Sequence, residues 1–414
     1  MDNLNKNNFN LAHAKAPIAV FLVVAMLAGF LVSRAVLSMS MILFGLNALW
    51  NIPPKKWLNE KWWLWGVAWI ALFALSIFWS EDKHYWSEHV QVKLPLLLLP
   101  LSFAFLPPFS KRQTDVYTAA LCVALLSGIA YSAYFFLQNP AAYIEGYRFS
   151  HVLPTLPERE HIRFTLALAL GIVWCFYYYP FLKNTIAKTA LAAIIVLFIA
   201  AVHIYAVRTG LLAFYVFITG YLIYLLFQKR TRFIAFLSIV LFVLFSYSAF
   251  RFIPTLRLKV DHFKWSVMIF EKQEMKPEYS DIGRYISYDL ALKIIKKHPL
   301  YGIGAGDIFS EMTKGYEQFY PQVRKELYLI PHNQLLIIAV AAGIPAMLVF
   351  GIWLCYPLTE LRRSRNGFFF FITWLMLLIP IFVEPILEIQ FGLFVFIFFM
   401  LWQRQMMLKP IRIL

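Results

Sequence analysis

Apolar runs alternate with short polar segments along the whole chain. A hydrocarbon core of about 30 Å requires about 20 mostly apolar residues per helix, and the apolar runs reach that length repeatedly. The twelve spans predicted in this way are 17–33, 35–50, 62–80, 94–108, 116–138, 163–180, 188–207, 210–227, 233–252, 333–357, 367–383 and 389–404. Because twelve is an even number, both ends of the chain are expected on the same side of the membrane.

The composition agrees with a membrane protein. Of the 414 residues, 61% are hydrophobic and only 14% are charged, and the mean hydropathy is +0.66. A soluble domain is closer to half apolar. We therefore predict an all-α polytopic membrane protein. Its transmembrane helices occupy residues 1–253 and 332–414, and one large, partly helical loop occupies residues 254–331.

The net charge of +16 is explained by where the basic residues fall. Taken together with the two chain ends, one set of alternate loops carries 18 basic and 4 acidic residues, which leaves 14 of the 16 net charges on one side. Basic residues accumulate in cytoplasmic loops. This side is therefore expected to face the cytoplasm, and the charge requires no nucleic-acid partner. The loop 254–331 is expected to face outward.

The other outward segments are short, namely 80–93, 139–163, the turn at Arg208, and 383–390. The stretch 80–93 places Tyr85, Trp86, His89 and Val90 at helical spacing. This pattern predicts an amphipathic helix along the outer interface of the membrane.

Arg208 stands at the outer end of the seventh span, in the sequence AVRTGLLAFY. A charge at this depth costs free energy, about 2.5–3.5 kcal/mol at the centre of a span and less toward the interface. An arginine that binds lipid phosphates is one interpretation. The apolar residues on both sides and the neighbouring Gly210, which allows another group to approach closely, favour a functional one.

Arg284 belongs to the outward loop. Apolar residues between Asp281 and Lys297 have helical spacing, with Asp281 as the predicted N-cap and Pro299 beyond the helix end. Arg284 would then lie in the first turn, where free N–H groups and the helix dipole attract anions. An anion site and a solvated arginine on an amphipathic helix are equally compatible with this pattern.

A glycine-rich run, YGIGAG, follows from Tyr301 to Gly306. Such a run can cradle a phosphate. No strand precedes it and no Lys-Ser/Thr pair follows it, so it is not a Walker loop. We interpret it as a turn that lets the loop pack against the membrane helices.

His332 and Asn333 stand directly before the tenth span. The positive end of the helix dipole and partial burial both oppose protonation of the imidazole. A neutral imidazole can accept a proton as a general base. In the alternative interpretation His332 bonds to a loop carbonyl and Asn333 caps the helix. The pattern alone does not separate the two interpretations.

No metal site is expected from the sequence. The outward histidines show no metal-binding spacing with one another. The carboxylates Asp281, Asp289 and Asp307 do not form a paired motif.

The chain resembles the O-antigen ligases and the related O-antigen polymerases of Gram-negative inner membranes. The local matches are RTG at 208–210, HPLYGIGAG at 298–306, and His332-Asn333 followed by nine residues and then Gly343. The order of these motifs, their spacing and their common side of the membrane carry the resemblance, which extends over nearly the whole chain.

The resemblance implies a glycosyltransferase of GT-C-like architecture in the bacterial inner membrane, with both termini cytoplasmic and a periplasmic active site. Arg208 and Arg284 match arginines that would hold the donor diphosphate, and His332 matches the histidine that would act as the catalytic base. Arg163, at the outer start of the sixth span, is a further candidate for phosphate contact. Asn333 is a secondary candidate for substrate binding.

The implied partners are a glycan donor linked to undecaprenyl diphosphate, a lipid A-core acceptor and membrane lipids, and no cofactor is implied. Tyr279, Tyr316 and Tyr320 are candidates to stack on sugars. A polymerase and a protein O-oligosaccharyltransferase of the same superfamily are the nearest alternatives. A transporter of lipid-linked sugars is the alternative outside enzymes, although charged or broken spans near the midplane, which such proteins carry, are not evident.

Overall fold

The computed structural model describes residues 2–147, 152–156, 158, 160–228, 232–271, 280–363 and 367–409. All the regular elements within these ranges are helices. This confirms the predicted all-α class.

Each predicted span falls on a helix. These helices are α1 (Asp2–Val32), α2 (Arg34–Leu49), α4 (Lys61–Leu75), α6 (Pro95–Phe105), α7 (Lys111–Gln138), α9 (His161–Tyr178), α10 (Thr185–Tyr205), α11 (Arg208–Phe227), α12 (Arg232–Phe252), α16 (Gln334–Cys355), α17 (Gly367–Val383) and α18 (Gln390–Leu408).

By length and composition, eight of the described helices are able to cross a membrane, so the chain is a multi-pass membrane protein. Helices α2 and α17 and the 236–252 part of α12 are shorter apolar helices. Helix α6 has only 11 residues, which is about 16 Å of helix against a hydrocarbon core of about 30 Å. The count of twelve crossings stays a prediction.

The remaining helices lie between the apolar ones. They are α3 (Pro54–Trp57), α5 (Lys83–Lys93), α8 (Pro140–Gly146), α13 (Pro254–Glu271), α14 (Ser280–Lys297) and α15 (Ile308–Phe319). Helix α5 confirms the helix predicted within 80–93, and its side chains His89 and Lys93 are buried.

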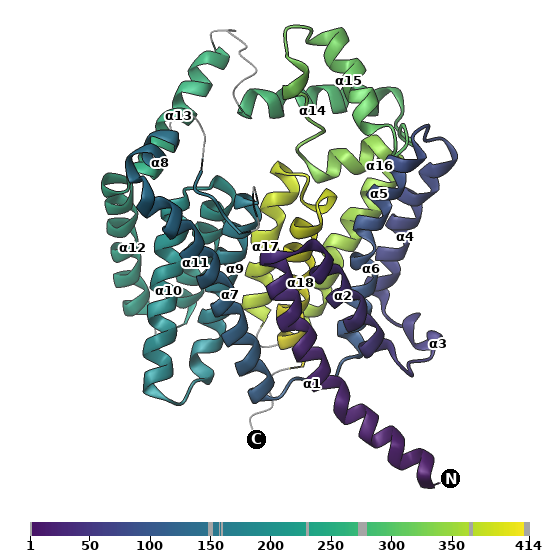
Figure 1. The fold of residues 1–414 in the computed structure, drawn as a ribbon, viewed down its shortest axis with the longest axis vertical. Helices are drawn as coiled ribbons and strands as arrows, with labels where there is room; N and C mark the ends of the chain where they lie inside the picture. Colours follow the sequence, from purple (N-terminus) through teal and green to yellow (C-terminus); the bar gives the residue numbers. More distant parts are fainter. Residues whose placement is uncertain are drawn as a thin grey trace.

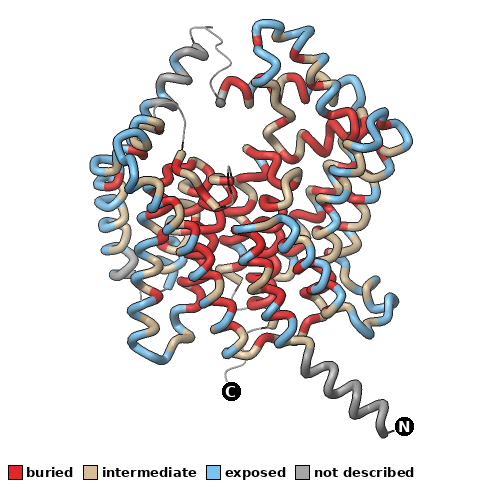
Figure 2. The backbone as a smooth tube through the Cα atoms, in the orientation of Figure 1, coloured by how far each residue is buried: buried red, intermediate tan, exposed pale blue. Residues whose placement is uncertain are grey.

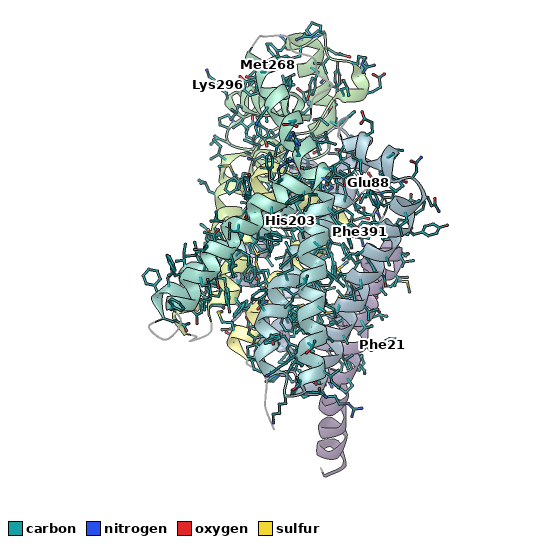
Figure 3. The ribbon with its side chains drawn as sticks, turned by 90° about the vertical axis from the view of Figure 1, so that its left-hand side faces the viewer. Phe21, Glu88, His203, Met268, Lys296 and Phe391 are labelled. Atoms are coloured by element: carbon teal, nitrogen blue, oxygen red, sulfur yellow. The ribbon has the colours of Figure 1, made fainter. Side chains whose placement is uncertain are left out.

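Helices α14 and α15 lie at one end of the molecule, and both chain termini lie at the opposite end (Figure 1). We call these ends the loop side and the terminus side. The view turned by 90° places Lys296 and Met268 toward the loop side and Phe21 toward the terminus side (Figure 3).

Helices α9 and α18 form the centre of the bundle, where the buried residues concentrate (Figure 2). Residues 391–402 of α18, FGLFVFIFFMLW, are apolar on every face, and a helix segment of this kind is buried against other helices. Helices α10, α11 and α12 instead expose large apolar side chains, including Val196, Leu212 and Phe236. A lipid environment accommodates such exposed side chains.

Helix α16 is broken near its middle. Gly343 has φ +82° and ψ 172°, which interrupts the helical path. Pro345 follows and carries no N–H group, so the carbonyl of Ala341 has no helical donor four residues later. The break also releases the carbonyl of Val340 from its usual partner, the N–H of Ile344.

The glycine-rich run supplies the missing partners. The N–H groups of Ile303 and Gly304 donate to the two freed carbonyls, at 2.8 Å and 3.0 Å, and the N–H of Ile344 donates to the carbonyl of Pro299 at 2.8 Å. A Cβ atom on Gly304 would come within 2.4 Å of the Ser80 hydroxyl. The run therefore packs against the bundle, which confirms its interpretation as a packing turn.

Replacing Gly343 with alanine is expected to destabilise the protein. The added Cβ would lie 2.2 Å from the carbonyl oxygen of Leu300, and this backbone conformation, which almost only glycine adopts, costs other residues about 1–3 kcal/mol. Thermal unfolding of the detergent-purified protein should show a lower Tm. Gly351→Ala, on the same helix with no atom within 4 Å of the added Cβ, serves as the control. Equal Tm values for the two variants would contradict this account.

Candidate active site

Helix α14 is fastened to the bundle by a short ion pair. The Nη2 atom of Arg284 lies 2.5 Å from Oε1 of Glu384, which directly follows α17. The Glu384 side chain is only 4% exposed. The Arg284 side chain is 26% exposed. Loss of Arg284 would leave the buried Glu384 carboxylate without this partner, which is unfavourable, so the contact helps to hold α14 at the end of α17.

A tyrosine one turn farther along α14 makes a second attachment. The hydroxyl of Tyr288 donates to the carbonyl oxygen of His332 at 2.7 Å, and the carbonyl oxygen of Phe382 lies 3.2 Å away. The Ser287 hydroxyl accepts from the His332 N–H at 3.4 Å. Three segments, α14, the start of α16 and the end of α17, therefore meet at His332.

The imidazole of His332 is held in one orientation. Its Nδ1 atom lies 3.0 Å from the carbonyl oxygen of Ile330. Because a carbonyl only accepts hydrogen bonds, Nδ1 carries the proton when the ring is neutral. The Nε2 atom then bears the lone pair, which is the form a general base requires.

Burial lowers the pKa of His332 below its ordinary value. The carboxylate of Glu384 and the bond to Ile330 oppose this effect, and the guanidiniums of Arg284 and Arg163 add to it. The ring is therefore neutral near pH 7. Arg284 and Glu384 belong to the two segments that bond beside His332, and Arg163 acts on the ring through its charge.

Asn333 caps α16. Its Oδ1 atom accepts from the N–H groups of Leu335 and Leu336, at 2.9 Å and 3.2 Å, and its Nδ2 atom donates to the carbonyl of Phe382. The general-base and the capping interpretations of the His332-Asn333 pair are thus compatible. Asn333 caps the helix, and His332 uses only Nδ1 to bond the loop carbonyl, so its Nε2 atom remains able to accept a proton.

Arg163 stands in the first turn of α9 and is buried. Its Nε atom lies 3.4 Å from Oε2 of Glu160, and Arg34 approaches the other Glu160 oxygen at 3.9 Å. Neither Arg163 Nε nor Glu160 Oε2 has a hydrogen-bond partner among the described residues. Burial raises the pKa of Glu160, against the opposing effect of Arg163 and then Arg34.

Arg208 is the first residue of α11. A Cβ atom on Gly210 would come within 2.8 Å of the Cβ atom of Thr165, so the first turns of α11 and α9 touch. Helix α11 also packs against α17. Arg208 and Arg163 therefore project from adjacent helix starts.

Two expectations for the loop are corrected by the structure. Helix α14 already includes Ser280, so Asp281 lies inside the helix and is not its N-cap. Tyr316 is fully buried and stacks on Tyr328 at a ring separation of 4.3 Å, so it packs the loop core instead of offering a face to a sugar.

The other two loop tyrosines have different outcomes. The Tyr320 hydroxyl donates to Asp289 at 2.7 Å. Tyr279 lies outside the described residues.

Within the described part of the chain, no group of three His, Cys, Asp or Glu side chains is placed to hold a metal ion.

The sequence analysis did not single out Glu384. It lies in the stretch VEPILEIQ, which has two acidic residues between two apolar spans. That placement was a usable signal, because an acid at the end of a span needs a positive partner.

The geometry defines a multi-pass membrane protein with a basic site on its loop side. Residues 193–351 match the family model described as O-antigen ligase. This match supports the resemblance to the O-antigen ligases, a family of glycosyltransferase-like enzymes, over that part of the chain. Arg208, Arg284 and His332 fall within the matched region. A search of curated proteins found no match.

Replacing Glu384 with glutamine should lower the pKa of His332 further. The Glu384 carboxylate favours the imidazolium form, so its loss moves the half-titration point of His332 to lower pH. The measurement is the rate of carbethoxylation of His332 against pH, followed by peptide mass spectrometry. Glu88→Gln, which changes an exposed carboxylate on α5, should leave the curve in place. An unchanged or higher pKa in Glu384→Gln would contradict the assignment.

Proposed function

We propose that the protein is an O-antigen ligase of the bacterial inner membrane. It transfers a glycan en bloc from undecaprenyl diphosphate to a sugar hydroxyl of lipid A-core. The observation that carries this proposal is the position of a neutral His332, with Nε2 as an acceptor, beside Arg284 and Arg163. His332 and Arg284 lie within the region matched to the O-antigen ligase family.

The sidedness of the reaction rests on charge. The loops and chain ends of the terminus side carry 14 of the 16 net positive charges, and positive loops remain in the cytoplasm. We place the loop side, and with it the 254–331 segment and the active site, in the periplasm. Both termini are then cytoplasmic.

The reaction inverts the anomeric configuration. The Nε2 atom of His332 takes the proton from the acceptor hydroxyl, and the hydroxyl oxygen attacks the anomeric carbon of the donor. The bond between that carbon and the diphosphate oxygen breaks from the opposite face, and its electron pair leaves on the diphosphate. The products are the glycosylated acceptor, undecaprenyl diphosphate and an imidazolium at His332.

Arginine side chains stabilise the leaving diphosphate. Arg208 and Arg284 hold its oxygens with charge-assisted hydrogen bonds, and Arg163 contributes the positive charge of its guanidinium. Fixed guanidiniums supply positive charge where the leaving group becomes more negative, so no divalent cation is required. Glu384 stabilises the imidazolium that forms on His332, since its carboxylate favours the protonated ring.

The alternatives share these catalytic residues. A polymerase would join one lipid-linked glycan to another, and a protein O-oligosaccharyltransferase would use a serine or threonine hydroxyl. The single large loop at 254–331 favours the ligase over a polymerase. The charged groups gather at the loop side, where a glycosyltransferase needs them, which disfavours a transporter.

Deletion of the gene followed by electrophoresis of the lipopolysaccharide tests the proposal. A ligase predicts loss of all long chains together with accumulation of the glycan on undecaprenyl diphosphate. A core bearing one repeat unit would indicate a polymerase instead. An unchanged lipopolysaccharide with lost glycoproteins would indicate protein glycosylation.

His332→Ala should abolish complementation of the deletion strain. Loss of a general base costs about 10²- to 10⁴-fold in rate, while the protein should still insert at its normal level. His84→Ala provides the control, because the His84 side chain is 88% exposed. Normal lipopolysaccharide ladders from His332→Ala would remove the base from the mechanism.

Arg208→Lys should slow transfer by about 10- to 100-fold. Lysine keeps the charge but lacks the planar fork, and one lost charge-assisted hydrogen bond is worth about 1.5–3 kcal/mol. The assay is transfer by the purified protein with a lipid-linked donor. Arg112→Lys changes an exposed arginine on the terminus side and should be neutral. Equal rates for both variants would exclude Arg208 from diphosphate binding.

A further inference from the structure

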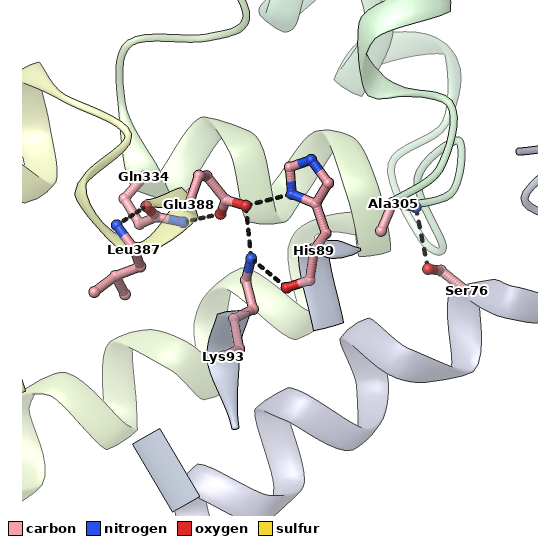
Figure 4. Close-up of polar contacts among 7 residues, drawn as sticks. All are labelled: Ser76, His89, Lys93, Ala305, Gln334, Leu387 and Glu388. Carbon is pink, nitrogen blue, oxygen red and sulfur yellow. Dashed lines mark hydrogen bonds and ion pairs between the residues drawn. The ribbon is translucent and has the colours of Figure 1, made fainter. Parts of the chain in front are cut away.

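A buried charge network lies beside the candidate active site (Figure 4). Lys93 and Glu388 form an ion pair, with Nζ of Lys93 2.6 Å from Oε2 of Glu388. The Nδ1 atom of His89 lies 2.5 Å from the same oxygen. The Nε2 atom of Gln334 donates to the other Glu388 oxygen at 2.7 Å, and Oε1 of Gln334 accepts from the Leu387 N–H at 2.9 Å.

The network is almost completely shielded from solvent. Lys93 and Gln334 are 0% exposed, and the Glu388 side chain is 3% exposed. Burial raises the pKa of Glu388, but the charges of Lys93 and His89 outweigh it and hold that pKa well below its ordinary value. The carboxylate is therefore ionised, and both of its oxygens are hydrogen-bonded.

The ammonium group of Lys93 is satisfied in the same way. It donates to the carbonyl of His89 at 3.2 Å and lies 4.4 Å from the centre of the Phe73 ring, in addition to its contact with Glu388. Apolar residues of similar size often fill a buried site at least as stably as an ion pair does. Stability alone therefore does not account for this network.

The network connects the segments that carry the candidate catalytic groups. Gln334 comes two residues after His332, and Glu388 comes four residues after Glu384. The bonds between Gln334 and residues 387–388 fix the start of α16 against the turn after α17. Lys93 anchors that turn to α5, which is a separate helix of the bundle.

We propose that Lys93, Glu388 and Gln334 are positioning residues that set the place of His332 relative to Glu384. The catalytic role of His332 in this inference rests on the proposed function. The network does not touch His332 itself, and it acts through the backbone of the two segments it joins. The charged and titratable groups that face His332 are Arg284 and Tyr288 of α14, Arg163 of α9, and Glu384.

The test uses Gln334→Met in the purified full-length protein. Methionine fills a similar volume but removes both hydrogen bonds to residues 387–388. With Glu384 less firmly placed, its effect on His332 weakens, and the half-titration point of His332 should fall by about half a pH unit or more. The readout is carbethoxylation of His332 against pH, which requires no substrate.

Transfer kinetics give the second readout. A displaced base lowers kcat, by about tenfold for the expected shift in geometry, while KM stays within about twofold because the donor still binds. Gln405→Met is the control, since Gln405 is also a buried glutamine, 4% exposed, near the C-terminal end of α18. It should change neither the titration nor kcat.

A double variant, Lys93→Met with Glu388→Met, covers the case in which Gln334→Met does not fold. It removes Lys93 and Glu388 together, so neither of these two buried charges is left without the other. This variant should also lower the half-titration point of His332. The inference is overturned if the folded variants titrate like the wild type, including the case in which kcat falls without a shift.

Failure of the proposed function gives a different result. Wild-type protein would then show no transfer to lipid A-core, although His332 would still titrate at lower pH in the variants than in the wild type. That outcome keeps the network as the group that positions His332 and rejects only the ligase reaction.

Discussion

A charge at the end of a membrane helix needs an opposite charge or a hydrogen-bond partner, and this constraint organises the loop side of the protein. The ion pair between Arg284 and Glu384 satisfies this requirement for both charges. It joins α14 to the end of α17 across 100 residues of sequence. The same pairing places both groups beside His332. Together with the hydrogen bonds of Tyr288 and Ser287, it fixes the loop helix over the bundle.

The break in α16 also attaches the loop to the membrane helices. Gly343 and Pro345 free two carbonyls, and the glycine-rich run supplies their donors. The run begins at Tyr301, shortly after α14 ends at Lys297. Its attachment to α16 therefore positions the C-terminal end of α14 against the bundle. Loop and membrane helices thus pack together, and the candidate site draws its residues from α9, α11, α14, α16 and the turn after α17.

The helices were predictable because apolar length and composition are local properties of the chain. Asn333 and the glycine-rich run were also interpretable, since capping and tight packing leave local signals. Arg163 and Arg284 were grouped with His332 only through the family resemblance, because the pattern of residues does not show contacts between distant segments. Glu384 and Lys93 were missed for the same reason. The short loop that contains Glu384 and the amphipathic stretch that ends at Lys93 do not show which distant groups pair with these two charges.

The central claim is that Arg208, Arg284 and His332 surround one diphosphate on the loop side. An experimental structure of the full-length protein with undecaprenyl diphosphate bound tests it most directly. We expect the diphosphate between Arg208 and Arg284, with Nε2 of His332 facing the position of the missing glycan. A diphosphate bound elsewhere, or these three side chains lining separate cavities, would contradict the account.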